Sequence, residues 1–208
     1  TELVSLESLW LQNCTAGNMG LEHIKNLKSL KQIVLFNTNV TGNGLAILQE
    51  LPELTELTCH NIKGDEVSLA FLEKLNGLKS LSITRANVRN ADLEHLSNMT
   101  NLEQLDLSFT SITDDGLTNL TSLKSLRHLS LWGNHISDNG LPWLGTLKNL
   151  ETLQISGGFT DAGLVHLEGL TSLKTLAITA TGVTQEGIDR LKTKIPVKEV
   201  RFSSMGSK

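Results

Sequence analysis

The chain has no tyrosine, and aromatic residues make up only 4% of its 208 residues. A core with so few rings must be built from aliphatic side chains, and a hydrophobic content of 39% is sufficient for one. An aromatic residue that lies outside this core therefore has no packing reason to be there. Such residues are the first candidates for a binding function.

Other scarcities exclude broad classes of protein. No run of eighteen apolar residues is present, so we expect no membrane insertion. Lys and Arg occur singly and the formal net charge is −4, so the chain lacks the basic stripe that phosphate backbones require. We therefore expect no nucleic acid partner. Residues 1–11 lack Met, a basic segment and an apolar segment, so we do not expect these residues to act as a signal peptide.

One pattern recurs along the whole chain. In residues 102–125 a leucine spacing of two is followed by a spacing of three to four, which predicts a strand, a corner and a short helix. The unit begins at eight leucines, spaced by 24 residues except for 23 in the last interval: Leu6, Leu30, Leu54, Leu78, Leu102, Leu126, Leu150 and Leu173. A ninth strand is predicted over 197–202. Positions within a unit are numbered below from its first leucine.

The pattern LxxLxLxxTxITxxGLxxLxxLxx resembles the leucine-rich repeat. The residues that carry the resemblance are 38–41, 110–117, 160–164 and 181–184. They look like the 24-residue TxVTDxGLxxLxxL repeats of bacterial leucine-rich repeat proteins, and they are also similar to the cysteine-containing repeats of F-box ubiquitin ligases. Only Cys14 places a cysteine at position nine, and F-box helices are missing, so we prefer the bacterial variety. The resemblance implies an α/β solenoid, a curved horseshoe with a concave parallel β-sheet and short convex helices.

We interpret residues 1–208 as one domain, because each unit of a solenoid packs only on its neighbours. Leu3 falls where Leu27 and Leu51 fall in later units, without a polar cap before it. We therefore expect the chain to be a fragment of a longer protein.

Position nine is expected to point inward and to hydrogen-bond the backbone of adjacent units. It is occupied in turn by Cys14, Thr38, Ile62, Ala86, Thr110, Asn134 and, after a gap, Thr181. We expect irregular structure over 61–72, where the corners match poorly, and at Gly157 and Gly158, where one residue is deleted. The TxxG corners are expected to cap the helices that follow.

The two cysteines lie two units apart, at roughly 10 Å by strand spacing, which exceeds disulfide reach. We expect Cys14 and Cys59 to be buried free thiols. Of the six histidines, His23, His95 and His166 recur at matching helical positions, which is typical of a solvated convex face. Trp143 also lies on the helical side, where we expect it to pack.

Side chains alternate along a strand, so positions three, five and seven, with eight beyond them, are expected to line the concave surface. Large side chains occupy several of these positions in the first six units. We predict a ligand-binding strip made of Trp10, Phe36, His60, Arg85, Phe109, His128 and Trp132. The competing interpretation is that aromatics favour strands through β-propensity alone.

No catalytic or metal site is expected. Asp106, His128 and Ser130 could be neighbours and superficially suggest a nucleophile with its base, but an open strand surface supplies no oxyanion hole and excludes no water. His60 and His128 are nearly three strands apart, which is too far for a shared ion.

The sequence thus predicts a non-enzymatic protein–protein interaction module without a cofactor, which binds a protein partner on its concave face. Three alternatives stay open. A glycan could stack on Trp and Phe while Asn13, Asn37, Asn61 and Gln104 supply hydrogen bonds; the repeats could serve an F-box type ubiquitin ligase; or the chain could be a spacer. The sequence does not indicate a compartment.

Overall fold

The computed structural model describes residues 3–64 and 67–204, without the side chains of residues 180, 181 and 204. In these residues nine parallel strands form one sheet, and the order of the strands in the sheet follows the order in the chain. The strands are β1 (Ser8–Gln12), β2 (Gln32–Phe36), β3 (Glu56–His60), β4 (Ser80–Thr84), β5 (Gln104–Asp106), β6 (His128–Ser137), β7 (Thr152–Thr160), β8 (Thr175–Gly182) and β9 (Glu199–Ser204).

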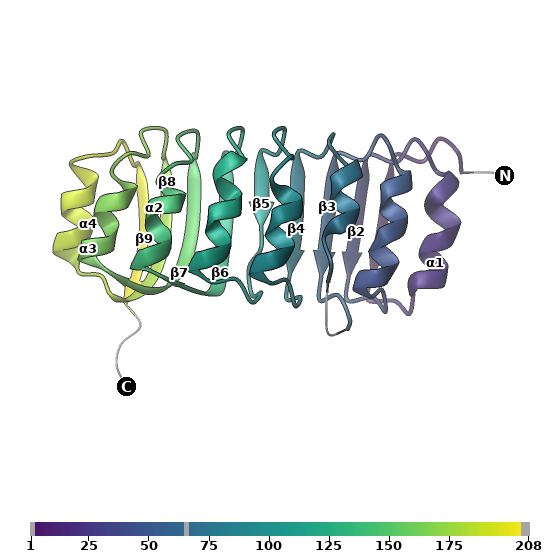
Figure 1. Cartoon of the computed structure of the whole chain (residues 1–208), viewed down its shortest axis with the longest axis horizontal. Coiled ribbons are helices and arrows are strands. Elements are labelled where there is room, and N and C mark those ends of the chain that lie inside the picture. The colour runs from purple at the N-terminus through teal and green to yellow at the C-terminus, as the bar shows by residue number, and fades with distance from the viewer. Residues whose placement is uncertain (1–2, 65–66, 205–208) are drawn as a thin grey trace.

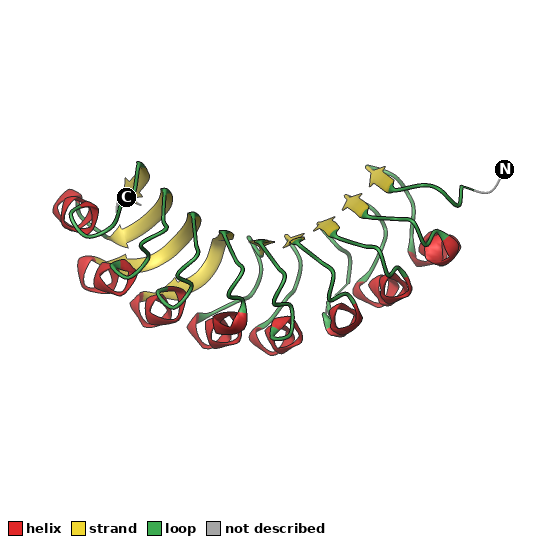
Figure 2. Cartoon of the chain, turned by 90° about the horizontal axis from the view of Figure 1, so that it is seen from above, coloured by secondary structure: helices red, strands yellow, loops and turns green. Residues whose placement is uncertain are grey.

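Short helices form a second layer that covers one face of the sheet (Figure 1). They are α1 (Asn18–Glu22), η1 (His23–Asn26), η2 (Gly42–Glu50), η3 (Ala70–Lys74), η4 (Asn90–Leu96), η5 (Asp114–Ser122), η6 (Asp138–Gly140), α2 (Leu141–Leu144), α3 (Asp161–Leu164), η7 (Val165–Leu167) and α4 (Gln185–Lys192). Most are 3₁₀ helices rather than α-helices. Figure 2 shows the strands on the concave side of the arc and the helices on the convex side, as the sequence predicts.

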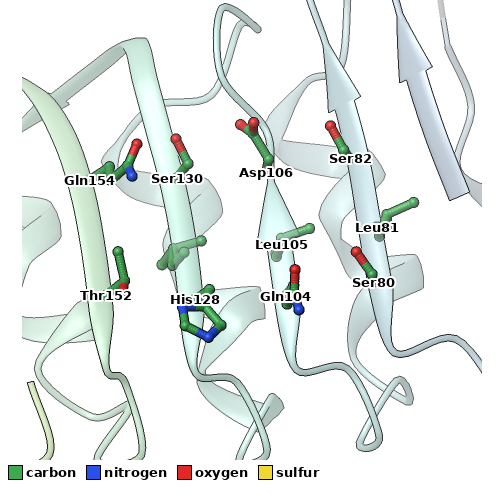
Figure 3. Close-up of a pocket in the computed structure, with 11 residues that line it drawn as sticks. Ser80, Leu81, Ser82, Gln104, Leu105, Asp106, His128, Ser130, Thr152 and Gln154 are labelled. Carbon is green, nitrogen blue, oxygen red and sulfur yellow. The ribbon is translucent and has the colours of Figure 1, made fainter. Parts of the chain in front are cut away.

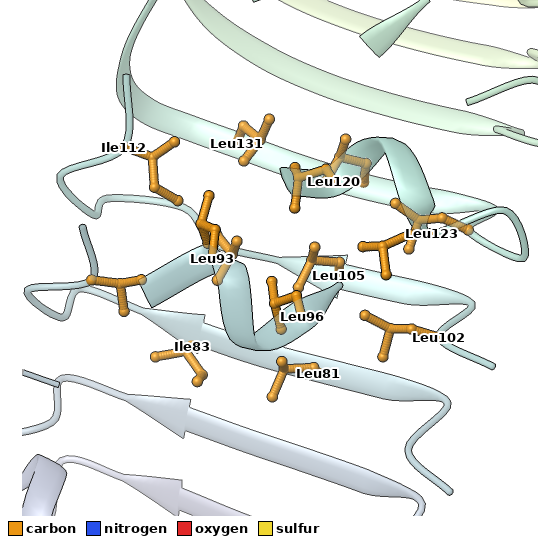
Figure 4. Close-up of a cluster of buried hydrophobic side chains, with 14 of the residues drawn as sticks. Leu81, Ile83, Leu93, Leu96, Leu102, Leu105, Ile112, Leu120, Leu123 and Leu131 are labelled. Atoms are coloured by element: carbon orange, nitrogen blue, oxygen red, sulfur yellow. The ribbon is translucent and has the colours of Figure 1, made fainter. Parts of the chain in front are cut away.

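The leucine spacing explains both layers. From β1 to β6, consecutive strands pair at a constant offset, so Leu81, Leu105 and Leu129 are register partners, and each is at most 2% exposed. On the helical side, Leu93, Leu96 and Leu120 point back into the same core (Figure 4). Every unit thus contributes strand and helix leucines to one continuous cluster, as expected for a solenoid core.

The corners hold neighbouring units together through a side chain that the sequence interpretation assigned to capping alone. The Asp114 carboxylate accepts hydrogen bonds from the Ser137 N–H at 2.8 Å and the Ser137 hydroxyl at 2.6 Å. Gly140 lies against this carboxylate, and a Cβ there would come within 2.5 Å of its oxygen. The same pair of hydrogen bonds joins Asp138 to Thr160 and Asp161 to Thr184. A related pair joins Asn18 to Thr41 and Asn90 to Thr113, where the Asn amide oxygen accepts from the backbone N–H and the Asn amide nitrogen donates to the hydroxyl. The TxxG motif is therefore mainly an inter-unit clamp.

Helix capping accompanies this clamp in the last three corners. Ser137, Thr160 and Thr184 each accept a hydrogen bond from a backbone N–H in the first turn of the helix that follows. Thr113 makes no such bond. The capping prediction is thus correct for the later units and wrong for Thr113, because its hydroxyl accepts a hydrogen bond from Asn90 instead.

Position nine makes the expected hydrogen bonds to the backbone where two consecutive units both have a polar residue there. The buried Thr110 hydroxyl donates to the Leu107 carbonyl at 2.8 Å, and the Asn134 amide nitrogen donates to the same carbonyl at 2.8 Å. Ile62 and Ala86 fill this position with buried apolar side chains. Cys59 is buried and Cys14 is half-buried, and both are free thiols. The prediction of complete burial is therefore wrong for Cys14, since only β2 packs against β1.

The predicted irregularity at Gly157 and Gly158 is confirmed. The register between β6 and β7 shifts between Leu131 and Ile136, and that between β7 and β8 shifts between Gly157 and Thr160. The irregularity expected over 61–72 falls partly on residues 65–66, which lie outside the described residues. Within residues 3–64 and 67–204, no helix has both the length and the apolar character needed to cross a lipid bilayer.

Candidate functional site on the concave face

The concave surface consists of three rows of side chains that run from strand to strand. Positions three, five and seven of each unit point away from the leucine core, and the constant offset aligns them into rows. Figure 3 shows two of the rows side by side on β4 to β7, at positions three and five. Between β4 and β7 these rows contain small or polar side chains, so the face is not covered by bulky groups there.

Position eight forms a fourth row with an unusual backbone. Asn13, Asn37 and Asn61 have positive φ angles of 49°, 50° and 57°, and each donates its backbone N–H to a carbonyl of the next strand. Their side chains also form a ladder, because Asn37 donates to Asn13 and Asn61 donates to Asn37, both at 3.0 Å. Asn tolerates this left-handed conformation better than most residues. Asn at position eight was the signal for this turn, and the sequence interpretation missed it.

Arg85 and Phe109 continue this row, although its left-handed backbone conformation is energetically unfavourable for their side chains. Their φ angles are 51° and 55°, in a region that bulky residues seldom occupy. The Arg85 guanidinium lies 4.5 Å from the centroid of the Phe109 ring, and this ring is 50% exposed. Gly133 makes room for it, since a Cβ at Gly133 would overlap the ring. Local strain of this kind is commonly found at functional sites.

The fifth strand is also irregular at this place. The Asp106 carboxylate oxygen Oδ1 accepts hydrogen bonds from the Ser108 N–H at 2.9 Å and the Ser108 hydroxyl at 2.5 Å. The β4–β5 pairing consequently stops at Asp106, whereas the β3–β4 pairing continues for two more residues. The Ser108 hydroxyl lies 2.8 Å from that of Ser130. A carboxylate is thus fixed on the concave face by its own strand.

These features surround one depression of about 380 Å³, which we call the carboxyl-end hollow because it lies at the carboxyl ends of the strands. It is lined by His60, Thr84, Arg85, Asp106, Ser108, Phe109, Ser130, Trp132 and Gln154. The structure therefore brings four residues of the predicted strip together. The sequence interpretation missed its polar floor, although Thr84, Asp106 and Ser108 could be read from the row positions.

His128 lies in a separate depression of about 260 Å³, the amino-end hollow, which shares Asp106, Ser130 and Gln154 with the first (Figure 3). Ser130 pairs with Ser108 rather than with His128. The arrangement of nucleophile and base considered from the sequence is therefore not formed among the described hydrogen bonds.

The other strip residues lie outside the carboxyl-end hollow. Trp10 is on β1, 60% exposed, and its indole N–H is 2.9 Å from both the Ser8 hydroxyl and the Gln32 amide oxygen. Phe36 stacks on His60 with ring centroids 4.3 Å apart and an interplanar angle of 7°. Phe36 thus supports a wall of the hollow from behind, whereas Trp10 is distant from it.

His60 is held in place by several groups. Its Nδ1 atom lies 2.8 Å from the Thr84 hydroxyl. Burial and the positive charge of Arg85 lower the pKa of His60 below its ordinary value of 6.5, and the Asp106 carboxylate opposes this shift. His60 is therefore a mostly neutral ring at pH 7.

On the convex side, Trp143 is 41% exposed, so it packs only in part. His23 and His166 are exposed as expected, whereas His95 is only partly exposed, and its Nδ1 atom lies 2.6 Å from the Glu73 carboxylate. In the described part of the chain, no three His, Cys, Asp or Glu residues are grouped to hold a metal ion.

The structure has the leucine-rich repeat fold, and solved proteins of that fold superpose on it. An internalin from Listeria monocytogenes has a TM-score of 0.68 at 20% identity over 98% of this chain, and a leucine-rich repeat protein from Leptospira interrogans has 0.65 at 22% over 96%. A plant peptide hormone receptor, RGFR1, in complex with RGF2 has 0.55 at 16% over 87%. No family model matches the chain, and no curated protein matches it in sequence.

The chain spans only part of each of these proteins: 63% of the internalin, 55% of the Leptospira protein and 29% of the plant receptor. At these identities the likeness concerns the fold, and what the chain binds must be argued from its own side chains.

Proposed function

We propose that the chain is a non-enzymatic interaction module that binds a protein partner on its concave face, with the carboxyl-end hollow at the centre of the contact. The observation that carries the proposal is the pair Arg85 and Phe109, which keeps bulky side chains in a left-handed backbone while half of the ring stays exposed. The cation–π contact between the two side chains offsets only part of the cost of this strain. Burial of the exposed Phe109 side chain against a bound partner would add the missing stabilisation.

The composition around the pair supports the same function. Aromatic residues and Arg are enriched at the centres of protein interfaces, where they fill pockets of the partner and exclude water. Here Phe109, Arg85 and Trp132 surround one hollow, and Trp10 extends the surface towards β1. The plant receptor of the same fold is in complex with RGF2, so in that protein the fold serves partner binding.

The test is retention of proteins from the source organism's extract on the immobilised chain. We expect a protein to be retained by the native chain and lost with Phe109→Ala combined with Trp132→Ala. The matched control is Trp143→Ala, which removes a partly exposed tryptophan from the convex side. Circular dichroism must show that all variants are folded. Equal retention by the native and the concave variants would contradict the proposal.

A further inference from the structure

The carboxyl-end hollow has a chemistry that points beyond a protein contact. We infer that it is a binding subsite for one neutral, polyhydroxylated ring, the pyranose unit of an oligosaccharide. This inference does not rest on the proposed function, because it is argued from the chemistry of the groups that line the hollow and from no property of a protein partner.

The first argument is the arrangement of ring faces. Phe36 and His60 are register partners on β2 and β3, so their stack runs in the strand-to-strand direction. Towards β4, the hydroxyl of Thr84, the register partner of His60, lies 2.8 Å from the His60 Nδ1 atom and helps to fix the ring in this stack. Three strand spacings of about 4.8 Å separate β3 from β6, which places Trp132 about 14 Å away. The carboxyl-end hollow lies between these two walls, and Arg85 and Phe109 border it as well.

The second argument is the supply of fixed hydrogen-bonding groups. Asp106 Oδ1 is occupied by Ser108, whereas Asp106 Oδ2 has no hydrogen-bond partner among the described residues. The Gln154 amide oxygen accepts a hydrogen bond from the Trp132 indole N–H at 3.0 Å, which orients both side chains. Together with the Ser130 hydroxyl, these groups are held in place before a ligand arrives. Such preorganisation lowers the entropic cost of binding.

The third argument is charge. Arg85 and Asp106 both line the hollow, and both act on His60 with opposite sign. A strongly acidic ligand would meet the Asp106 carboxylate, and a strongly basic one would meet the Arg85 guanidinium. A hydroxyl group donates to a carboxylate and accepts from a guanidinium. Neighbouring hydroxyls of a neutral sugar can therefore satisfy both charges, and charge-assisted hydrogen bonds of this type are the stronger ones.

The fourth argument is size. A volume of about 380 Å³ is near the lower end of the range of 300–1,000 Å³ for small-molecule sites. The amino-end hollow adds about 260 Å³ and shares Asp106, Ser130 and Gln154. A second sugar unit can therefore continue along the strands without leaving the concave face. This continuity favours an oligosaccharide over a free monosaccharide.

The experiment is calorimetric titration of the native chain with neutral hexasaccharides built from glucose, mannose, xylose or N-acetylglucosamine. We expect at least one to bind and Asp106→Asn to weaken that binding at least tenfold, since an amide NH2 group in the place of the charged Oδ2 atom cannot accept a hydrogen bond from a ligand hydroxyl. Ser130→Ala is a second, milder variant that keeps the Asp106–Ser108 bonds, and it should weaken binding several-fold. Trp143→Ala should bind like the native chain.

Two results would overturn the inference: no hexasaccharide binds at millimolar concentration, or one binds equally well to the native chain and to folded Asp106→Asn and Ser130→Ala variants. Failure here is distinguishable from failure of the proposed function. If the concave double variant no longer retains the protein partner and no hexasaccharide binds the native chain, the proposed protein interaction is supported and the sugar subsite is ruled out.

Discussion

The Arg85 guanidinium lies 4.5 Å from the Phe109 ring centroid, and both residues have left-handed backbones. The contact gains a cation–π interaction of about 0.5–1 kcal/mol at an exposed site. Each non-glycine residue in a sparsely populated backbone region costs about 1–3 kcal/mol. The backbone strain of the two residues is therefore larger than the stabilisation from their contact. The asparagines earlier in the row have the same backbone conformation, which Asn tolerates better.

Phe109→Asn should be more stable than Phe109→Ala by about 0.5–1 kcal/mol, because Asn tolerates positive φ and Ala does not. Both variants lose the ring, so the difference between them isolates the backbone term. Urea unfolding followed by circular dichroism measures it. If the alanine variant is equally or more stable, the left-handed conformation is not a significant source of strain.

Gly163→Ala should destabilise the chain by about 2 kcal/mol or more, since the new Cβ would overlap the Asp138 carboxylate of the preceding unit. Gly158→Ala is the matched control, because a Cβ at Gly158 has no atom within 4 Å, and its stability should stay within about 0.5 kcal/mol.

The same overlap predicts a coupling. Adding Asp138→Ala to Gly163→Ala should cost less than the sum of the two single changes, because the alanine at 138 leaves space for the new Cβ. Thermal or chemical unfolding of the four proteins tests this. Strict additivity would show that the clamp is not the source of the penalty.

Asp161 should make stability fall in acid. Hydrogen bonds from the Thr184 hydroxyl and N–H lower the pKa of the Asp161 carboxyl below its ordinary value of 3.8. The unfolded chain therefore binds this proton first as the pH falls, so the stabilisation is present above pH 3.8 and is lost as the pH passes through the lower folded-state pKa.

The check is urea unfolding of the native chain and Asp161→Asn at a series of pH values from 6 to 2.5. The native chain should be the more stable at pH 6, and its advantage should shrink in acid. An advantage that does not change with pH would contradict the assigned cause.

The two cysteines should differ in reactivity. Burial raises the pKa of the Cys59 thiol to about 12, so hardly any thiolate exists at pH 8. With a disulfide reagent at pH 8, the half-buried Cys14 should react in the native chain and Cys59 only after unfolding in guanidinium. Cys14→Ser is the control, since the folded variant should contain no thiol that reacts fast. Two fast thiols in the native chain would contradict the burial of Cys59.

Removing each of the two charged neighbours of His60 should shift its pKa in opposite directions. Arg85→Gln should raise it towards 6.5, and Asp106→Asn should lower it further, because the first change removes a positive charge and the second a negative one. NMR titration of the His60 ring measures both shifts. His166→Gln, on the convex side, should leave the pKa of His60 unchanged. A common direction for the two variants would show that charge is not the cause.

The fold could be predicted from the sequence because the leucine spacing is regular enough to be counted. A period of two predicts a strand and a period of three to four predicts a helix, and their alternation predicts parallel strands that pair in chain order. Local deviations were also predictable: the deletion at Gly157 and Gly158 led to the observed register shift.

The candidate site was less predictable. Alternation along the strands indicated that Arg85, Phe109 and Trp132 face the concave side, but it gave no information on which residues meet. The left-handed turn at position eight, the shortening of β5 by Asp106 and the contact of Phe109 with Gly133 depend on backbone angles and on neighbours 22–24 residues away.

The sequence by itself therefore determined the repeat, its two layers and the rows of outward side chains, because these follow from periodicity within one unit. Only the tertiary structure decided that His60, Arg85, Asp106, Phe109 and Trp132 share one hollow and that the corner aspartates clamp the next unit. The physical reason is that stacking brings side chains from different units within hydrogen-bonding distance. The geometry of those contacts is set by how the units pack against one another and not by any one of them.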